Sequence, residues 1–180
     1  MSVPSNYNSS DYILDIRDDV ITERKIGRAS QTTVLRCKDG REWVLLNQPD
    51  VVDRFKGFLY LEKKIREKEI INCLAAPNKI SKYRGRICYL SEYVGEAKLE
   101  FDPFNMKHIQ KLQIVAFLQG DARFIDIGNY GIWTNVRVHN EKIYVFDTEK
   151  SSFDKSVHPN IDSFQDIHDT ILKEAERQLG

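Results

Sequence analysis

Asn135 and Asp147 flank a short predicted hairpin in the last third of the chain. Its strands cover residues 136–138 and 142–146, where β-branched and aromatic side chains surround a turn. Because a hairpin brings its two ends together, we expect the Asn135 amide and the Asp147 carboxylate to converge, with Asp126 just upstream. Amide and carboxylate oxygens are ligands that Mg²⁺ uses beside phosphate oxygens. This group of residues therefore indicates a nucleotide site.

A loop of small residues between two predicted strands is a second candidate for phosphate binding. Its sequence is Ile26-Gly27-Arg28-Ala29-Ser30-Gln31-Thr32-Thr33-Val34. Small side chains allow a loop backbone to lie close over phosphates and to offer its N–H groups. An ordinary hairpin loop is the alternative here. Turn formation is the alternative for the Asn and Asp residues, because both types favour loops whatever their function.

The elements that must position these residues follow from hydrophobic periodicity and turn residues. Strands are predicted within 21–46, around the Asp39-Gly40 turn, and at 79–83, 86–94, 136–138 and 142–146. Helices are predicted at 50–74, 104–120 and 163–179, and Gly57 is a candidate point of division in the first of them. A sheet interrupted by a helix, then a helix, a hairpin and a final helix, indicates an α+β fold.

Composition narrows the function classes. The 180 residues carry 27 Lys and Arg against 27 Asp and Glu, and this balance argues against a nucleic-acid binder, which would have a basic surplus. Three Cys lie far apart, which excludes zinc-ribbon and disulfide scaffolds and favours a reducing compartment. No apolar run is long enough for a membrane span. Residues 1–11 are expected to form a disordered tail without a Sec-type signal.

Five segments of the chain occur in an order that points to one family. They cover residues 27–34, 67–80, 89–95, 124–126 and 135–149. In this order the chain resembles the protein kinase-like superfamily, including its aminoglycoside phosphotransferase branch. The first segment resembles a degenerate G-x-G-x-x-G-x-V loop, and the third, Tyr89-Leu90-Ser91-Glu92-Tyr93-Val94-Gly95, resembles a kinase hinge. Asp147-Thr148-Glu149 replaces D-F-G with the D-x-E form of the phosphotransferase branch.

The resemblance assigns nucleotide-binding roles to residues in the first half of the chain. The residues that would cover the phosphates are Gly27, Ala29, Ser30, Thr32 and Val34. Those that would receive adenine are Glu92, Tyr93 and Val94, with Ser91 as the gatekeeper. Glu67 would be the glutamate of the αC helix, with Glu62 as the alternative.

The resemblance also implies the chemistry of the second half. Asp126 would stand for the aspartate of H-R-D and orient or deprotonate an acceptor hydroxyl. Asn135 and Asp147 would bind Mg²⁺, and ATP would be the phosphate donor. Asp126 precedes Asn135 by nine positions, where the family motif has five, so Asn129 competes with Asn135 as the amide on the metal side.

The chain departs from the family pattern at the lysine of V-A-I-K. The strand Trp43-Val44-Leu45-Leu46-Asn47 has no Lys, and in kinases that lysine holds the nucleotide phosphates. Lys56 or Lys63, from the following helix, is a candidate replacement. The sequence also lacks an A-P-E segment and most of a helical C-terminal lobe.

The implied fold is α+β and kinase-like. It has a five-stranded antiparallel sheet and an αC helix in residues 12–95, and a reduced helical C-lobe in residues 96–180. It resembles minimal kinase-like proteins, such as the small kinase effectors that some pathogenic bacteria inject into host cells, and this implies a cytoplasmic protein or one secreted into a host without a Sec signal.

The implied function is an atypical ATP- and Mg²⁺-dependent phosphotransfer to a protein or small-molecule hydroxyl. The first alternative is a pseudokinase that binds a protein partner without transferring phosphate. The second is an unrelated α+β domain. We expect a nucleotide and a protein as partners, and neither nucleic acid nor a membrane.

Overall fold

The computed structural model describes residues 7–27, 31–95, 98–100, 109–129 and 132–180. The chain divides into two compact units, and each is described by itself. Unit 1 consists of Met1–Val52, Pro77–Tyr93 and Gln165–Gly180, and unit 2 consists of Asp53–Ala76 and Val94–Phe164. This division differs from two consecutive lobes, because the last helix belongs to unit 1 and the first long helix belongs largely to unit 2.

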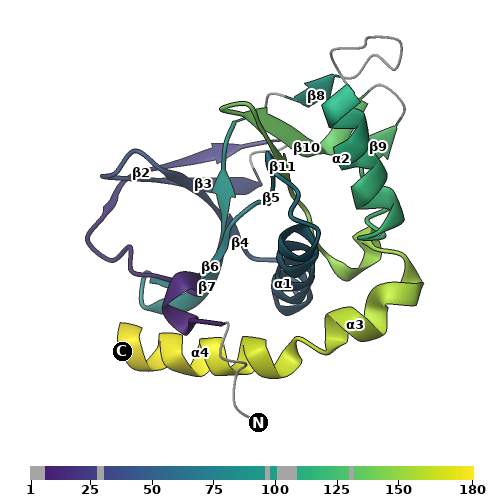
Figure 1. Cartoon of the computed structure of the whole chain (residues 1–180). Coiled ribbons are helices and arrows are strands. Elements are labelled where there is room, and N and C mark those ends of the chain that lie inside the picture. Colours follow the sequence, from purple (N-terminus) through teal and green to yellow (C-terminus); the bar gives the residue numbers. More distant parts are fainter. Residues whose placement is uncertain (1–6, 28–30, 96–97, 101–108, 130–131) are drawn as a thin grey trace. The chain divides into compact units, whose positions relative to one another are not determined.

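Unit 1 contains a six-stranded mixed sheet (Figure 1). Its strands, in spatial order, are β1 (Ile13–Leu14), β6 (Asn78–Tyr83), β7 (Arg86–Tyr93), β4 (Glu42–Leu46), β3 (Thr32–Cys37) and β2 (Val20–Ile26). All neighbours are antiparallel except β1, which pairs with β6 in parallel. The expected five-stranded antiparallel sheet therefore needs correction, because Ile13 and Leu14 add a sixth strand beside Ile80 and Ser81.

Two features at the ends of unit 1 complete it. The 3₁₀ helix η1 (Ser9–Tyr12) is capped by the side chain of Asn8, which accepts from the Ser10 backbone N–H. Part of the expected disordered tail is thus structured. The helix α4 (Gln165–Leu179) matches the helix predicted at 163–179 and buries one stripe of side chains. These are His168, Ile171, Ala175 and Leu179.

The sheet of unit 1 also has an apolar core on one face. Leu35 on β3, Trp43 on β4 and Leu90 on β7 are almost fully buried together with Ile16, which follows β1. Register explains why they share a face. Leu35 pairs with Trp43, and Leu90 pairs with Leu45, two residues along the same strand.

Unit 2 begins with most of helix α1 (Val51–Glu67), which is continuous through Gly57. The helix is shorter than the predicted 50–74, because the chain reverses through left-handed residues Glu69 and Asn72 and then forms β5 (Cys73–Ala75). Strand β5 pairs in parallel with β11 (Lys142–Val145). A helix-like apolar spacing near residue 74 was thus overridden by a long-range strand pairing.

The sheet of unit 2 has five strands, in the order β5-β11-β10-β8, with β9 also paired to β10. The additional strands are β8 (Lys98–Glu100), β9 (Gly128–Asn129) and β10 (Ile132–His139). Among its described residues, the other helices are α2 (Ile109–Gly120) and α3 (His158–Asp162), with 3₁₀ helices η4 (Lys150–Ser152) and η5 (Lys155–Val157). Unit 2 is thus built on a sheet as well as helices. Within the described residues, no helix is long and apolar enough to cross a bilayer.

Candidate functional site

Three carboxylates of unit 2 gather at one place. Asp126, Asp147 and Glu149 each offer an oxygen atom, and these atoms all lie within 4.8 Å of one another. The side chain of Asp126 is exposed, and the other two are partly buried. Like charges at this spacing repel one another, so the group favours a cation that neutralises it. Two of these residues, Asp126 and Asp147, are predicted site residues, and Glu149 belongs to the D-x-E segment.

The hairpin of β10 and β11 positions Asp147. Val136 pairs with Val145, and the backbone N–H of Phe146 donates to the carbonyl of Asn135 at 2.8 Å. Asp147 follows directly, with a left-handed backbone at φ 56° that Asp adopts more readily than most residues. The turn at Asn140 and Glu141, both at positive φ, closes the far end of this hairpin.

Asn135 connects the hairpin to the Asp126 segment. Its side-chain amide donates to the backbone carbonyl of Asp126 at 2.6 Å, and its backbone N–H donates to the carbonyl of Ile127 at 3.4 Å. The backbone N–H of Asp126 in turn donates to the carbonyl of Ser152 at 3.2 Å. Asn135 therefore fixes the loop that carries Asp126. This contact is separate from the metal-binding role predicted for Asn135. The side chain of its competitor Asn129 lies outside those described.

Arg54 on α1 is a site residue that the sequence analysis did not find. Its guanidinium donates to Asp147, and its second terminal nitrogen lies 3.0 Å from Oε2 of Glu149. Only 16% of its side chain is exposed. The three carboxylates and this guanidinium leave two net negative formal charges at the site. A single divalent cation would balance them.

The backbone of the same segment is also held by α1. The hydroxyl of Thr148 donates to the carbonyl of Arg54 at 2.9 Å. The hydroxyl of Ser152 donates to the carbonyl of Asp147 at 2.7 Å. Arg54 and Gly57 lie three positions apart, on neighbouring positions of one helix face, and both approach residues 147–149. No local sequence signal indicates Arg54, because its partners lie more than 90 positions away.

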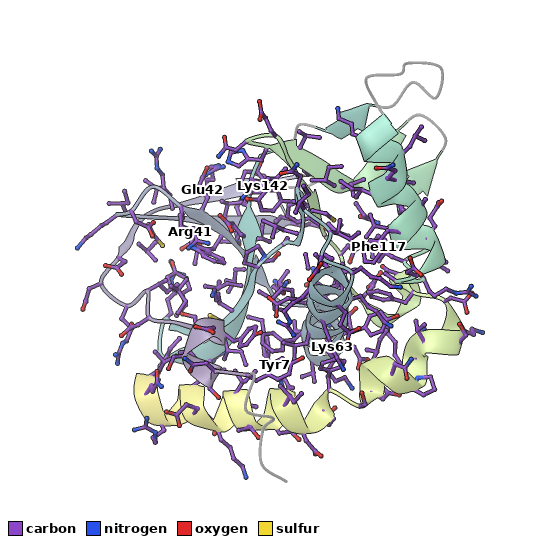
Figure 2. All side chains as sticks on the ribbon, in the orientation of Figure 1. Tyr7, Arg41, Glu42, Lys63, Phe117 and Lys142 are labelled. Carbon is purple, nitrogen blue, oxygen red and sulfur yellow. The ribbon has the colours of Figure 1, made fainter. Side chains whose placement is uncertain are left out.

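The two candidate replacement lysines bind other carboxylates. The ammonium group of Lys56 lies 3.2 Å from Asp53 and 3.5 Å from Asp162. Lys63, labelled in Figure 2, lies 3.7 Å from Glu67 on the same helix. Glu67 itself, the expected αC glutamate, is the last residue of α1, and 48% of its side chain is exposed.

In unit 1, the expected phosphate loop begins at Gly27, which has a left-handed φ of 80°. Ala29 and Ser30 lie outside the described residues. Thr32 starts β3 opposite Ile26, and Val34 pairs with Val44 on β4. Ser91 of β7 also pairs with Val44, so the side chains of these three residues share one face of the sheet. Gly27 thus follows β2 directly, and Thr32 and Val34 lie on β3.

The expected hinge residues end strand β7. The backbone N–H of Glu92 donates to the carbonyl of Pro77 at 2.9 Å, and its carboxylate lies 2.9 Å from the guanidinium of Arg41, labelled in Figure 2. Tyr93 pairs with Glu42 of β4. Val94 is the first residue after the strand and the first of the second segment of unit 2. The backbone N–H of Glu92 is therefore already used within unit 1.

No family model matches the sequence, and a search of curated proteins finds no significant match. The function is therefore inferred from the residues and geometry of the site.

Proposed function

We propose that this protein is a minimal, kinase-like phosphotransferase that uses ATP and Mg²⁺. The observation that carries the proposal is the convergence of Asp126, Asp147 and Glu149 within 4.8 Å at the end of a hairpin. A compact group of carboxylates with net negative charge suits a divalent cation, and phosphoryl transfer depends on such a cation to neutralise phosphate charge.

The arrangement of unit 1 supports the same proposal. Five consecutive strands in space, β6, β7, β4, β3 and β2, are antiparallel. Helix α1 occurs in the sequence between β4 and β6, where the resemblance expects the αC helix. Val34, Val44 and Ser91 share one face of the sheet. Two strand residues and a gatekeeper that all contact adenine would have to share a face in this way.

Each residue of the acidic group has a distinct role in the proposed reaction. Asp147 and Glu149 bind the cation that the nucleotide brings, and Asn135 holds the Asp126 loop. Asp126 accepts the proton of the acceptor hydroxyl while the hydroxyl oxygen bonds to the terminal phosphorus and the bond to the leaving nucleotide oxygen breaks. The bound cation supplies charge neutralisation of the phosphate oxygens.

Arg54 is proposed to supply the positive charge that the missing lysine would provide. Leu46, two residues beyond Val44 on the same strand face, occupies the position where the family has that lysine. In the described structure Arg54 contacts the two carboxylates that would hold the cation. Its guanidinium would then be placed to contact a phosphate oxygen, an acceptor to which its planar donors are well suited.

The same contact favours the second candidate function, a pseudokinase that binds a protein partner. A guanidinium that stays on Asp147 and Glu149 competes with any metal ion for their oxygen atoms. In that case the fold persists and phosphoryl transfer is lost.

The test compares the whole protein with its Asp147→Asn variant, using labelled ATP and Mg²⁺. We expect wild type to transfer label to itself or to added protein, and the variant to lose about 100-fold or more. The control is Asp121→Asn, which removes an exposed carboxylate that pairs with Lys68 at 3.9 Å. A melting-temperature rise with Mg²⁺-ATP but no transfer supports the pseudokinase. A protein that neither binds Mg²⁺-ATP nor transfers phosphate overturns the proposed phosphotransferase.

A further inference from the structure

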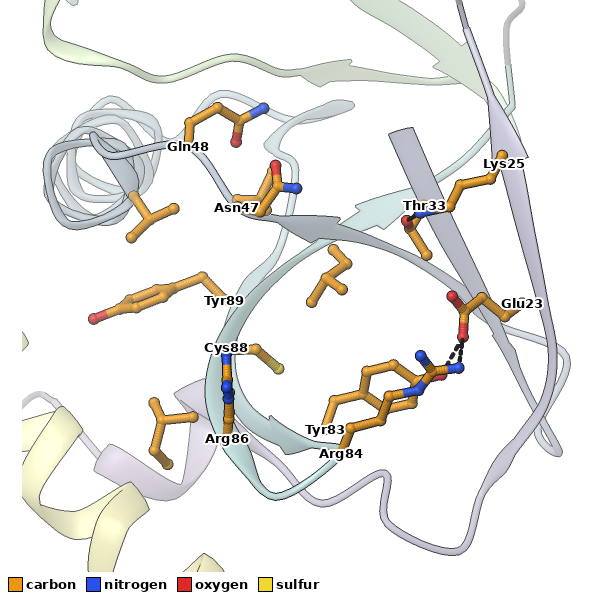
Figure 3. A pocket seen from close by; sticks show the side chains of 14 residues that line it. Glu23, Lys25, Thr33, Asn47, Gln48, Tyr83, Arg84, Arg86, Cys88 and Tyr89 are labelled. Atoms are coloured by element: carbon orange, nitrogen blue, oxygen red, sulfur yellow. Dashed lines mark hydrogen bonds and ion pairs between the residues drawn. The ribbon is translucent and has the colours of Figure 1, made fainter. Parts of the chain in front are cut away.

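Unit 1 contains a cavity of about 720 Å³ whose described lining residues include none of the predicted site residues (Figure 3). Strands β2, β3 and β4, the segment after β4, and the hairpin of β6 and β7 all contribute to its lining. Cavities that bind small organic molecules are typically 300–1,000 Å³, so this one is large enough to enclose a ligand.

The cavity is lined by residues from both faces of the sheet. Thr33 pairs with Leu45 on one face, and both line the cavity. Leu46 pairs with Tyr89, and because side chains alternate along a strand, these two lining residues belong to the other face, which also carries Val44. The cavity therefore lies where β4 ends, beside the segment of Asn47 and Gln48.

The floor of the cavity is apolar. Leu45 and Cys88 are partly buried and pack against the core of Leu35, Trp43 and Leu90. Loss of contact with water raises the pKa of the Cys88 thiol to about 11. The cavity thus borders this core, and Leu45 and Cys88 offer an apolar surface to a ligand.

One wall is closed by a contact between distant strands. Oε2 of Glu23 on β2 accepts hydrogen bonds from the Tyr83 hydroxyl at 2.5 Å and from Arg84 at 2.8 Å. In the sheet, β3, β4 and β7 separate β2 from β6, so the sheet curls far enough for these side chains to meet. Figure 3 shows Glu23 directed toward Tyr83 and Arg84 across the cavity.

The charges that line the cavity are unequal. Lys25, Arg84 and Arg86 are cationic, and Glu23 is the carboxylate among the lining residues. Arg84 forms an ion pair with Glu23. Lys25 donates to the neutral hydroxyl of Thr33, and within the described part of the chain Arg86 makes no ion pair. Two positive charges therefore remain without a carboxylate partner at the edge of an apolar cavity.

We propose that this cavity binds an amphipathic organic anion. The apolar body of the ligand lies against Leu45 and Cys88, and its carboxylate, phosphate or sulfonate group lies at the rim of the cavity. The apolar floor selects a ligand that loses hydrated surface on binding. Lys25 and Arg86 lie on opposite sides of the cavity (Figure 3) and make its rim positively charged, which selects a negative head group.

The first test is a fluorescence titration of the whole protein with 8-anilinonaphthalene-1-sulfonate. A neutral analogue, N-phenyl-1-naphthylamine, is titrated in parallel. In the double variant Lys25→Gln/Arg86→Gln we expect sulfonate affinity to fall about ten-fold or more, since the rim loses two positive charges, and neutral-probe affinity to change less than about two-fold. The control is Arg36→Gln, an exposed arginine of β3 on the Val34 face. Equal sulfonate affinity in wild type and the double variant overturns the proposal.

The second test locates the bound probe without a substitution. Wild type is treated with methyl methanethiosulfonate with and without the sulfonate probe, and each thiol is followed by peptide mass spectrometry. We expect the probe to slow modification of Cys88 and to leave the rates of the buried Cys37 and Cys73 unchanged. A bound probe that leaves the rate at Cys88 unchanged contradicts binding in this cavity.

Discussion

The α-carbon of Gly57 lies so near the carbonyl oxygen of Thr148 that a Cβ at position 57 would be 2.0 Å from that oxygen. The same Cβ would also lie 3.1 Å from the ring of Phe153. Helix α1 and the Asp147-Thr148-Glu149 segment can meet this closely only where no side chain intervenes. Gly57 therefore supports the geometry of the acidic group from within an unbroken helix.

Gly57→Ala is expected to destabilise the protein by about 2 kcal/mol or more, because backbone atoms must move to admit the methyl group. In an unobstructed helix the same change stabilises by about 1 kcal/mol. The matched control is Gly120→Ala at the end of α2, where a Cβ would meet nothing within 4 Å. Urea unfolding measures both variants. A Gly57→Ala protein as stable as wild type would show that this close approach is absent.

Arg54→Gln is expected to strengthen cation binding and weaken phosphotransfer. Removing the guanidinium leaves Asp147 and Glu149 without their counter-charge, so a divalent ion should bind several-fold more tightly. Transfer should fall, because the variant lacks the proposed phosphate contact. Mn²⁺ binding measured by electron paramagnetic resonance and transfer from labelled ATP give the two readouts. Lys68→Gln, which removes an exposed cation of unit 2, serves as the control.

Tighter Mn²⁺ binding together with slower phosphate transfer in Arg54→Gln would support the proposed role of Arg54. Weaker Mn²⁺ binding in Arg54→Gln would mean that the guanidinium organises the carboxylates rather than competing for them. Unchanged transfer would remove Arg54 from the reaction.

Asp147→Ala is expected to destabilise the protein more than Asp147→Asn, by about 1 kcal/mol. Both substitutions remove the carboxylate and its ion pair with Arg54. The backbone at this position is left-handed, with φ 56°, and Asn tolerates that conformation better than Ala. Thermal or urea unfolding of the two variants measures the difference. Equal stabilities would indicate that residue 147 leaves the left-handed region when Asp is replaced.

One group of contacts in unit 1 should make the stability of the fold depend on pH. The Tyr89 hydroxyl lies 2.7 Å from Nε2 of the buried His168, whose Nδ1 lies 2.9 Å from Asp169. The hydrogen bond with His168 lowers the pKa of the Asp169 carboxyl. A carboxyl with a lowered folded-state pKa stabilises the fold above its unfolded pKa of about 3.9, and this contribution is lost as the pH falls through the folded value.

We therefore expect wild type to be more stable than Asp169→Asn at pH 6, and the two to converge as the pH approaches 3. Urea unfolding between pH 6 and pH 3 follows this difference. Asp166→Asn on the same helix is the control, since the Asp166 side chain is exposed. A constant difference between wild type and Asp169→Asn at every pH would contradict the assignment to this carboxyl.

Local patterns were sufficient to predict much of the fold. The Asp39-Gly40 turn, the paired strands around it and the apolar stripe of α4 all follow from neighbouring residues. The approach of Asn135 and Asp147 followed from the geometry of a hairpin. Each of these features depends on a short stretch of chain, for which spacing is informative.

The remaining features depend on partners that are distant in the sequence. Strand β1 has two residues and forms only by pairing with β6, 67 positions later. Helix α1 ends early because Cys73–Ala75 pairs with β11, which no local signal indicates. Arg54 reaches Asp147 across 93 positions, so its role depends on tertiary packing. No spacing rule connects residues that far apart in a single sequence.

The interleaved order of the two units has a consequence for synthesis of the protein. Residues 53–164 contain all of unit 2, and α4, which covers the sheet of unit 1 through contacts with β6, follows them. Until α4 has left the ribosome, the earlier strands therefore expose the surface that Ile171 and Ala175 cover. A chain truncated after residue 164 should be protease-resistant in unit 2 and sensitive in unit 1.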